Sequence, residues 1–138
     1  MQTFLPYPDF DLSLACLDYR RLGKQRVESL QIIKANSAYR TKLKPYGWQN
    51  HPAVKMWRGY DNALMLYHNK AIEHWVERGY KNTMGLFTIE GPIVMPPWFG
   101  DEQFHLSHQS NLMRKAPEHY VQFHWTAPLN MPYVWPTN

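Results

Sequence analysis

The chain has 138 residues, 44% of them hydrophobic, with 15 Lys or Arg, 11 Asp or Glu and a formal net charge of +4. This length predicts a single domain over residues 1–138, with a core that buries about 68% of the surface exposed by the unfolded chain. No apolar run approaches ~18 residues, no signal peptide opens the chain and Cys16 is the single cysteine, which argues against a membrane-spanning helix, secretion, an internal disulfide and a cysteine-cluster metal site.

The positive charge is concentrated in one part of the sequence. Residues 17–58 hold ten Lys or Arg and two acids, a net +8, whereas the rest of the chain holds five and nine, a net −4. Such a basic segment fits a nucleic acid, an anionic membrane or a phosphorylated ligand as partner.

The first eleven residues, MQTFLPYPDFD, predict an extended arm. Pro6 and Pro8 each disfavour helix at the residue before them. After the arm we expect a short helical turn over residues 12–17, capped by Asp11 or Ser13.

A long helix is predicted over residues 17–35, with an acid in the middle of a basic sequence. Asp18 can cap its start or favour it through the helix dipole. At about 100° per residue the helix has two faces. The apolar face holds Tyr19, Leu22, Leu30 and Ile33, and the opposite, charged face holds Arg21, Lys24 and Glu28. Arg26 lies closer to the apolar face, so we expect it to be paired or directed at a ligand.

Glu28 has two interpretations at this point. In the first, Lys24 and Glu28 form an ordinary surface pair at i,i+4, worth about 0.2–0.5 kcal/mol. In the second, the carboxylate stays ionised in a strongly positive field and faces the reactive centre of an anionic partner.

The basic stretch at residues 37–47 is predicted to be a loop. Arg40, Lys42 and Lys44 alternate there with Tyr39 and Tyr46. Cations interleaved with aromatic rings suit a phosphate backbone, although an ordinary solvated loop has a similar composition.

Two further helices are expected. Pro52, with Asn50 or His51 at the cap, starts a pattern that continues to a stop at Gly79, with a kink or a break at Gly59. Residues 81–100 are irregular, and a third helix covers residues 101–115. Residues 118–138 are rich in aromatic residues and proline, so we expect them to be non-helical and to pack across the helices.

Metal binding and several common catalytic motifs find little support. His105 and His108, with Glu102 upstream, have spacing compatible with a metal site, but hydrogen bonding explains the pair better. We therefore expect no metal and no cofactor. No phosphate-binding glycine loop, HExxH motif or nucleophile elbow is present.

Five short segments together resemble a known family. They are RVESL at residues 26–30, GWQNHP at 47–52, ERGY at 77–80, Ser107-His108 and LMRK at 112–115. In this order and spacing, followed by the aromatic tail, they resemble the pyrimidine-dimer DNA glycosylases, the endonuclease V type of phage and bacteria.

The resemblance implies a mainly α fold, a compact single-domain bundle of about three helices with an extended N-terminal arm and an irregular aromatic C-terminal tail. It also implies a monomer, in the cytoplasm of a bacterial or phage-infected cell, that acts on double-stranded DNA with a damaged or modified pyrimidine. In this family the α-amine of the chain attacks C1′ of the damaged nucleotide, a helix glutamate assists, an imine forms and β-elimination cleaves the strand.

The resemblance also suggests site residues. Glu28 matches the helix glutamate, Asp18 competes for the same role, and Met1 supplies the amine. The expected DNA-binding residues are Arg21, Lys24, Arg26, Arg40, Lys42, Lys44, His51, His108, Arg114 and Lys115.

Gln2 departs from the family pattern, in which a small second residue is exposed after removal of the initiator methionine. A bulky residue there normally prevents this removal, so either Met1 is retained and supplies its own amine, or the chemistry does not pass through an imine. If Met1 were lost, Gln2 could cyclise and the amine would vanish. Two other routes stay open: Glu28 activates water and the enzyme has no lyase activity, or Lys24 is the amine.

The sequence therefore predicts a DNA base-excision enzyme. Two alternatives remain: a non-catalytic nucleic-acid-binding module with the same basic surface, and an enzyme that acts on a modified base rather than on dimers.

Overall fold

The computed structural model describes residues 1–41 and 47–137. Its helices are α1 (Phe10–Cys16), α2 (Tyr19–Thr41), α3 (Pro52–Lys55), α4 (Asp61–Glu77), α5 (Glu102–Lys115) and α6 (Pro117–Tyr120), and a 3-10 turn follows at Val121–Phe123. Within these ranges no residue forms a β-strand. The predicted mainly α class is confirmed, with α2, α4 and α5 as the three long helices.

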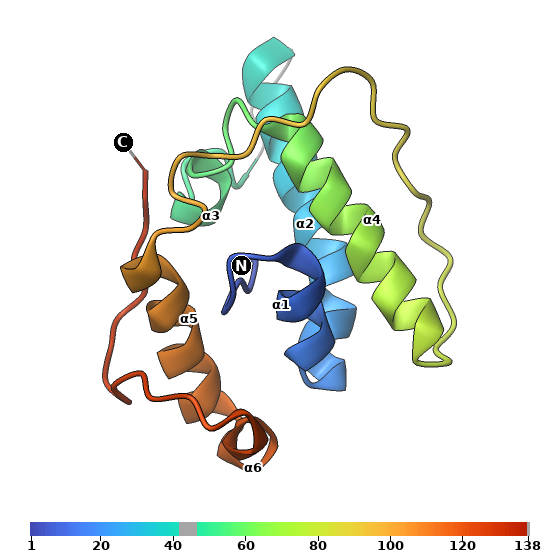
Figure 1. Cartoon of the computed structure of the whole chain (residues 1–138). Coiled ribbons are helices and arrows are strands. Elements are labelled where there is room, and N and C mark those ends of the chain that lie inside the picture. The colour runs from blue at the N-terminus through green and yellow to red at the C-terminus, as the bar shows by residue number, and fades with distance from the viewer. Residues whose placement is uncertain (42–46, 138) are drawn as a thin grey trace.

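The helices surround the N-terminal arm. Figure 1 shows α2 and α4 side by side, α1 in front of them, and α5 on the other side of the arm. The arm therefore runs through the middle of the molecule, between α5 and the pair formed by α1 and α2. The C-terminal tail returns along α5.

The core between these elements is largely aromatic. Trp57, Tyr67 and Phe104 are completely buried, and Phe10 and Trp98 pack against them. These large side chains fill the space around the arm. Among the described residues, no helix is both long enough and apolar enough to cross a lipid bilayer.

The cap of α1 differs from the prediction. The side chain of Asp9 accepts a hydrogen bond of 2.8 Å from the N–H of Leu12, so the helix begins at Phe10. The predicted caps are engaged elsewhere: Asp11 pairs with side chains of α4, and Ser13 exchanges hydrogen bonds with the backbone of Tyr7.

Helix α2 is longer than predicted and includes residues expected to be in a loop. Asn36 is buried near its C-terminal end, where its amide donates to the carbonyl of Val54 and accepts from Arg58. These bonds anchor the C-terminal part of α2, which ends at Thr41. Lys42 and Lys44 lie outside the described residues.

Glycine interrupts the next helical pattern as expected. Gly59 has φ +91°, a left-handed conformation that favours glycine, and it separates α3 from α4. His51 is the N-cap of α3, since its Nδ1 atom accepts from the N–H of Ala53. Gly79, with φ +92°, lies just beyond the end of α4.

The tail contains helix that was not predicted. Residues 117–123 form α6 and the 3-10 turn, because Pro117 at the first helical position needs no N–H partner and has a helical φ. Tyr120 is buried in α6, and Trp125 bonds to the hydroxyl of Tyr7 through its indole nitrogen. The aromatic residues of the tail thus hold it against the arm and the helices.

Candidate active site at the N-terminal arm

Side chains of α2 hold one side of the arm. Gln25 is fully buried; its Oε1 atom accepts from the N–H of Phe4 at 2.9 Å, and its Nε2 atom donates to the carbonyl of Gln2 at 3.2 Å. The hydroxyl of Tyr67 donates to the same Oε1 atom at 2.6 Å. A buried extended segment needs such partners because it has no helix or sheet of its own.

Two histidines of α5 hold the other side. His108 Nδ1 accepts from the N–H of Leu5 at 2.8 Å, and burial lowers the pKa of His108 to about 3, which keeps the ring neutral. His105 Nδ1 donates to the carbonyl of Leu5 at 2.7 Å, while its Nε2 accepts from Gly100. Both rings are therefore neutral supports of the arm, as the hydrogen-bonding interpretation expected.

The arm brings the chain's first residues to Glu28. The N–H of Gln2 donates to Glu28 Oε2 at 3.3 Å, and Gln25 Nε2 approaches the same oxygen at 3.4 Å. Burial raises the pKa of Glu28, against the opposing effects of the N-terminal ammonium group, the Gln2 N–H and Lys24. Across residues 1–41, which are all described, Lys24 and Glu28 do not form an ion pair, so the simple surface-pair interpretation does not hold.

Asp18 occupies a different position. It accepts a hydrogen bond of 2.6 Å from the hydroxyl of Tyr120 and one of 3.2 Å from Arg21. Burial acts to raise the pKa of Asp18, but these two partners outweigh burial and lower it. The carboxylate is thus ionised and bonded to both partners, and it positions Arg21.

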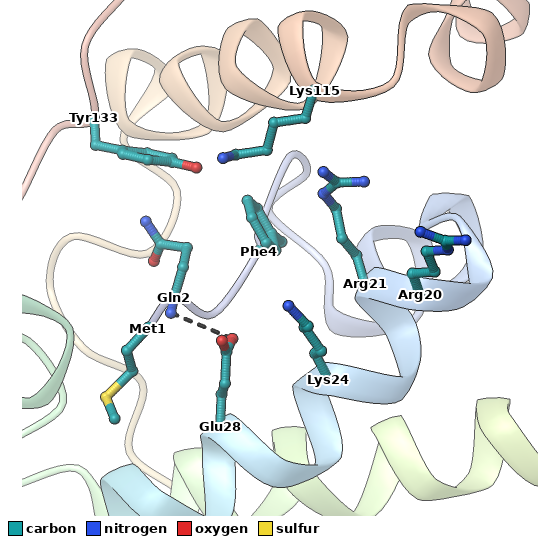
Figure 2. Close-up of a pocket in the computed structure, with 9 residues that line it drawn as sticks. All are labelled: Met1, Gln2, Phe4, Arg20, Arg21, Lys24, Glu28, Lys115 and Tyr133. Atoms are coloured by element: carbon teal, nitrogen blue, oxygen red, sulfur yellow. Dashed lines mark hydrogen bonds between the residues drawn. The ribbon is translucent and has the colours of Figure 1, made fainter.

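A cleft of about 600 Å³ opens beside Glu28. Figure 2 shows the side chains around it coming from the arm, from α2, from the end of α5 and from the tail. They are Met1, Gln2, Phe4, Arg20, Arg21, Lys24, Glu28, Lys115 and Tyr133. Four cations therefore line the cleft together with one carboxylate and the α-amine end of the chain, an arrangement suited to a phosphodiester around a reactive sugar.

The pyrimidine dimer DNA glycosylase family model matches residues 1–88. The chain belongs to this family. Membership confirms the resemblance carried by the sequence motifs and implies DNA glycosylase activity on pyrimidine dimers, hence a DNA substrate. No curated protein and no solved structure matches the chain.

The family match covers part of the cleft. Residues 1–88 include the arm and α1 to α4, and so contain Gln2 and Glu28. Lys115 and Tyr133 lie beyond the match. The wall of the cleft opposite α2 therefore comes from the part of the chain that the family model does not describe.

Several of the predicted residues meet in the cleft. Arg21 and Lys24 extend from α2 towards Lys115 of α5, and Met1 and Glu28 lie beside them (Figure 2). His51 does not line the cleft, and burial together with the N-terminal ammonium group lowers its pKa.

Other predicted DNA-binding residues bond within the protein and do not line the cleft. Arg26 donates to Asn82 and stacks on Trp75, as expected for a residue near the apolar face that must be paired. Arg40 pairs with Asp61 at the other end of α2.

Two predicted residues of α5 also have internal roles. Arg114 donates to the carbonyls of Leu129 and Met131 and so anchors the tail. The prediction that His108 binds DNA is wrong. Its side chain is 0% exposed, so its ring supports the arm and does not contact DNA.

The sequence did not predict five residues of this site: Gln2, Phe4, Arg20 and Tyr133, which line the cleft, and Gln25, which supports the arm. Arg20 belongs to the basic segment and could have been selected on charge alone. Gln2, Gln25 and Tyr133 carry no charge and match no motif, so their places depend on contacts between segments far apart in the chain.

Proposed function

We propose that this protein cleaves the N-glycosidic bond of a damaged pyrimidine in double-stranded DNA, such as that of one pyrimidine of a cyclobutane dimer. The observation that carries the proposal is the convergence of Glu28 and the first residues of the chain in a cationic cleft. Family membership supports the same activity. We further propose that the single domain acts as a monomer.

The four cleft cations have the role of binding the phosphates that flank the lesion. Arg20, Arg21 and Lys24 line the cleft on the α2 side, and Lys115 lines it on the α5 side (Figure 2). Phosphates held from two sides would keep the damaged nucleotide beside Glu28. Moving a nucleotide out of the stack costs a few kcal/mol, least for a damaged base, and this favours lesions.

The proposed chemistry begins at the α-amine of Met1. The neutral amine attacks C1′, and the C1′–N1 bond breaks with its electron pair remaining on the base. One amine proton goes to the base. The second goes to O4′ as the sugar ring opens, which leaves an imine between the enzyme and C1′.

Strand cleavage follows from this imine. Loss of a proton from C2′ expels the phosphate oxygen at C3′, and water then hydrolyses the imine to free the enzyme. Glu28 stabilises positive charge at C1′ during base release and takes protons from the attacking nitrogen. Its position beside the Gln2 N–H supports both roles.

Borohydride reduction tests this route against the two others. A reduced covalent adduct with an abasic duplex, mapped by peptide mass spectrometry to Met1, is the expected result. An adduct at Lys24, which also lines the cleft, would assign the amine to that residue. Base release with no adduct would instead support activation of water by Glu28.

A non-catalytic binding module is the alternative function, and the basic cleft also agrees with it. Incubation of the full chain with dimer-containing and modified-base duplexes separates the two. The products measured are free base from the modified-base duplexes, and an abasic site or a cleaved strand from the dimer duplex, where the detached pyrimidine stays joined to its partner. Binding without any product on the whole panel would reject the enzymatic proposal.

A further inference from the structure

The side chain of Gln2 holds a buried hydrogen-bond donor that has no partner. Gln2 is only 6% exposed, and its Oε1 atom accepts from the N–H of Thr3 at 3.0 Å. Its Nε2 atom is buried and bonds to no atom of the described residues. The Thr3 contact fixes the orientation of the amide, because a flipped amide would place two donors against each other.

This donor belongs to the cleft. Gln2 lines it, and Figure 2 shows the amide nitrogen directed towards Tyr133, whereas the backbone nitrogen of Gln2 faces Glu28. One residue therefore presents its backbone N–H to the carboxylate and a side-chain donor to the opposite part of the cleft.

An unpartnered buried donor is unfavourable for folding, and buried polar groups in native proteins are nearly always bonded. A role for this donor as a phosphate contact is not needed, because the cationic side chains of the cleft already suit phosphates. A neutral amide suits a neutral or weakly charged acceptor. Its place next to Glu28 puts it near the reacting sugar, where the base is attached.

We infer that Gln2 Nε2 donates a hydrogen bond to a carbonyl oxygen of the departing pyrimidine. When the C1′–N1 bond breaks, its electron pair stays on the base and spreads onto the carbonyl oxygen next to N1. A donor aimed at that oxygen stabilises the transition state of base release. The inference rests on the proposed function and adds to it a group that recognises the leaving base.

Tyr133 lies on the side of the cleft towards which the Gln2 amide nitrogen points. It belongs to the part of the tail that follows the 3-10 turn and is not helical. A base bonded to this amide would therefore contact the tail segment as well as the arm.

Two variants of Gln2 test the inference. Gln2→Met removes both polar atoms at similar length without adding a charge, whereas Gln2→Glu keeps an acceptor for the Thr3 N–H, removes the donor and adds a carboxylate. Both residues are bulky enough to retain Met1, which intact-mass measurement verifies. Two single-turnover reactions are compared for each variant: cleavage of the N-glycosidic bond in a dimer duplex, which is called base release below, and cleavage of a duplex with a preformed abasic site.

The donor is needed only while a base is leaving. We expect base release to fall about 100-fold in both variants, the scale for loss of one preorganised donor. Cleavage at the abasic site should fall less than about threefold. Equal losses in the two reactions, or unchanged base release, would overturn the inference.

These measurements also distinguish a failure of the proposed function from a failure of the Gln2 inference. A parent protein inactive on both duplexes rejects that function itself. A parent active on both, with Gln2→Met equally active, rejects only the role of the Gln2 side chain. Circular dichroism and thermal unfolding establish that each variant is folded, and either folded variant is sufficient for the comparison.

Discussion

The backbone N–H of Gln2 donates a hydrogen bond of 3.3 Å to Glu28 Oε2, which joins residues 26 positions apart. Consecutive Cα atoms are about 3.8 Å apart. The bond therefore confines the Met1 amine to the surroundings of this carboxylate. The approach of the chain's first residues to a half-buried acid is a consequence of how the arm crosses α2. Five predictions follow from it and from the cleft around it.

Replacing Glu28 by Gln should stop base release without loss of DNA binding. We expect the single-turnover rate to fall about 10²- to 10⁴-fold, the range for loss of a positioned acid or base. Duplex affinity should stay the same or rise, since the change removes a negative charge from a cationic cleft. Glu73→Gln, on the exposed side of α4, is the matched control. Full activity of Glu28→Gln would remove this residue from the mechanism.

The same variant should change the pH dependence of stability. Because the pKa of Glu28 is raised in the folded chain, its ionisation favours the unfolded chain as the pH rises through the window above the ordinary glutamate pKa. Glu28→Gln should therefore gain stability relative to the parent at pH 7 compared with pH 3.5. Denaturant unfolding at the two pH values measures this difference.

Asp18→Asn should change the pH dependence of stability in the opposite direction to Glu28→Gln. The pKa of Asp18 is lowered in the folded chain, so its contribution to stability is present above the ordinary aspartate pKa and is lost as the pH falls through the folded value. The Asn variant should be less stable than the parent at pH 7, with a smaller difference in acid. Changes of the same sign for both variants would contradict the assignment of the two environments.

Replacing Gln25 by Leu should loosen the arm. The N–H of Phe4 and the hydroxyl of Tyr67 would lose their shared acceptor, and an unsatisfied buried group costs about 1–3 kcal/mol. We expect the free energy of unfolding to fall by at least this amount and base release to fall with it. Gln103→Leu, exposed on α5, should change the unfolding free energy by less than about 0.5 kcal/mol. Urea denaturation of both variants measures these changes in the free energy of unfolding.

Removing a cleft cation should change the salt dependence of DNA binding. Each phosphate contact contributes about 0.9 to the slope of log K against log salt concentration for duplex DNA. Lys24→Gln and Arg21→Gln should each reduce the slope by about one, measured by fluorescence anisotropy. Lys34→Gln, exposed elsewhere on α2, should leave the slope nearly unchanged. If the slopes of Lys24→Gln and Arg21→Gln equalled that of Lys34→Gln, the cleft would be excluded as the phosphate-binding surface.

Local sequence patterns were sufficient for most of the helices and for one part of the site. Periodicity, proline at a first turn and glycine at a stop act over a few residues, so α4, α5 and the break at Gly59 could be predicted. Charge density identified the basic segment, and the family motifs identified Glu28. The N-terminal arm followed from Pro6 and Pro8.

Contacts between distant segments account for the rest. The anchoring of the C-terminal part of α2 depends on Asn36 reaching α3, and the burial of His108 depends on the arm passing α5. Arg26 and Arg114 are predicted from the sequence to bind DNA, and only the fold shows that they also bond to Asn82 and to carbonyls of the tail. Position along a chain does not reveal which groups a side chain meets after packing. For the same reason, Lys115 and Tyr133 enter the cleft only because α5 and the tail fold back over an arm more than 100 residues earlier.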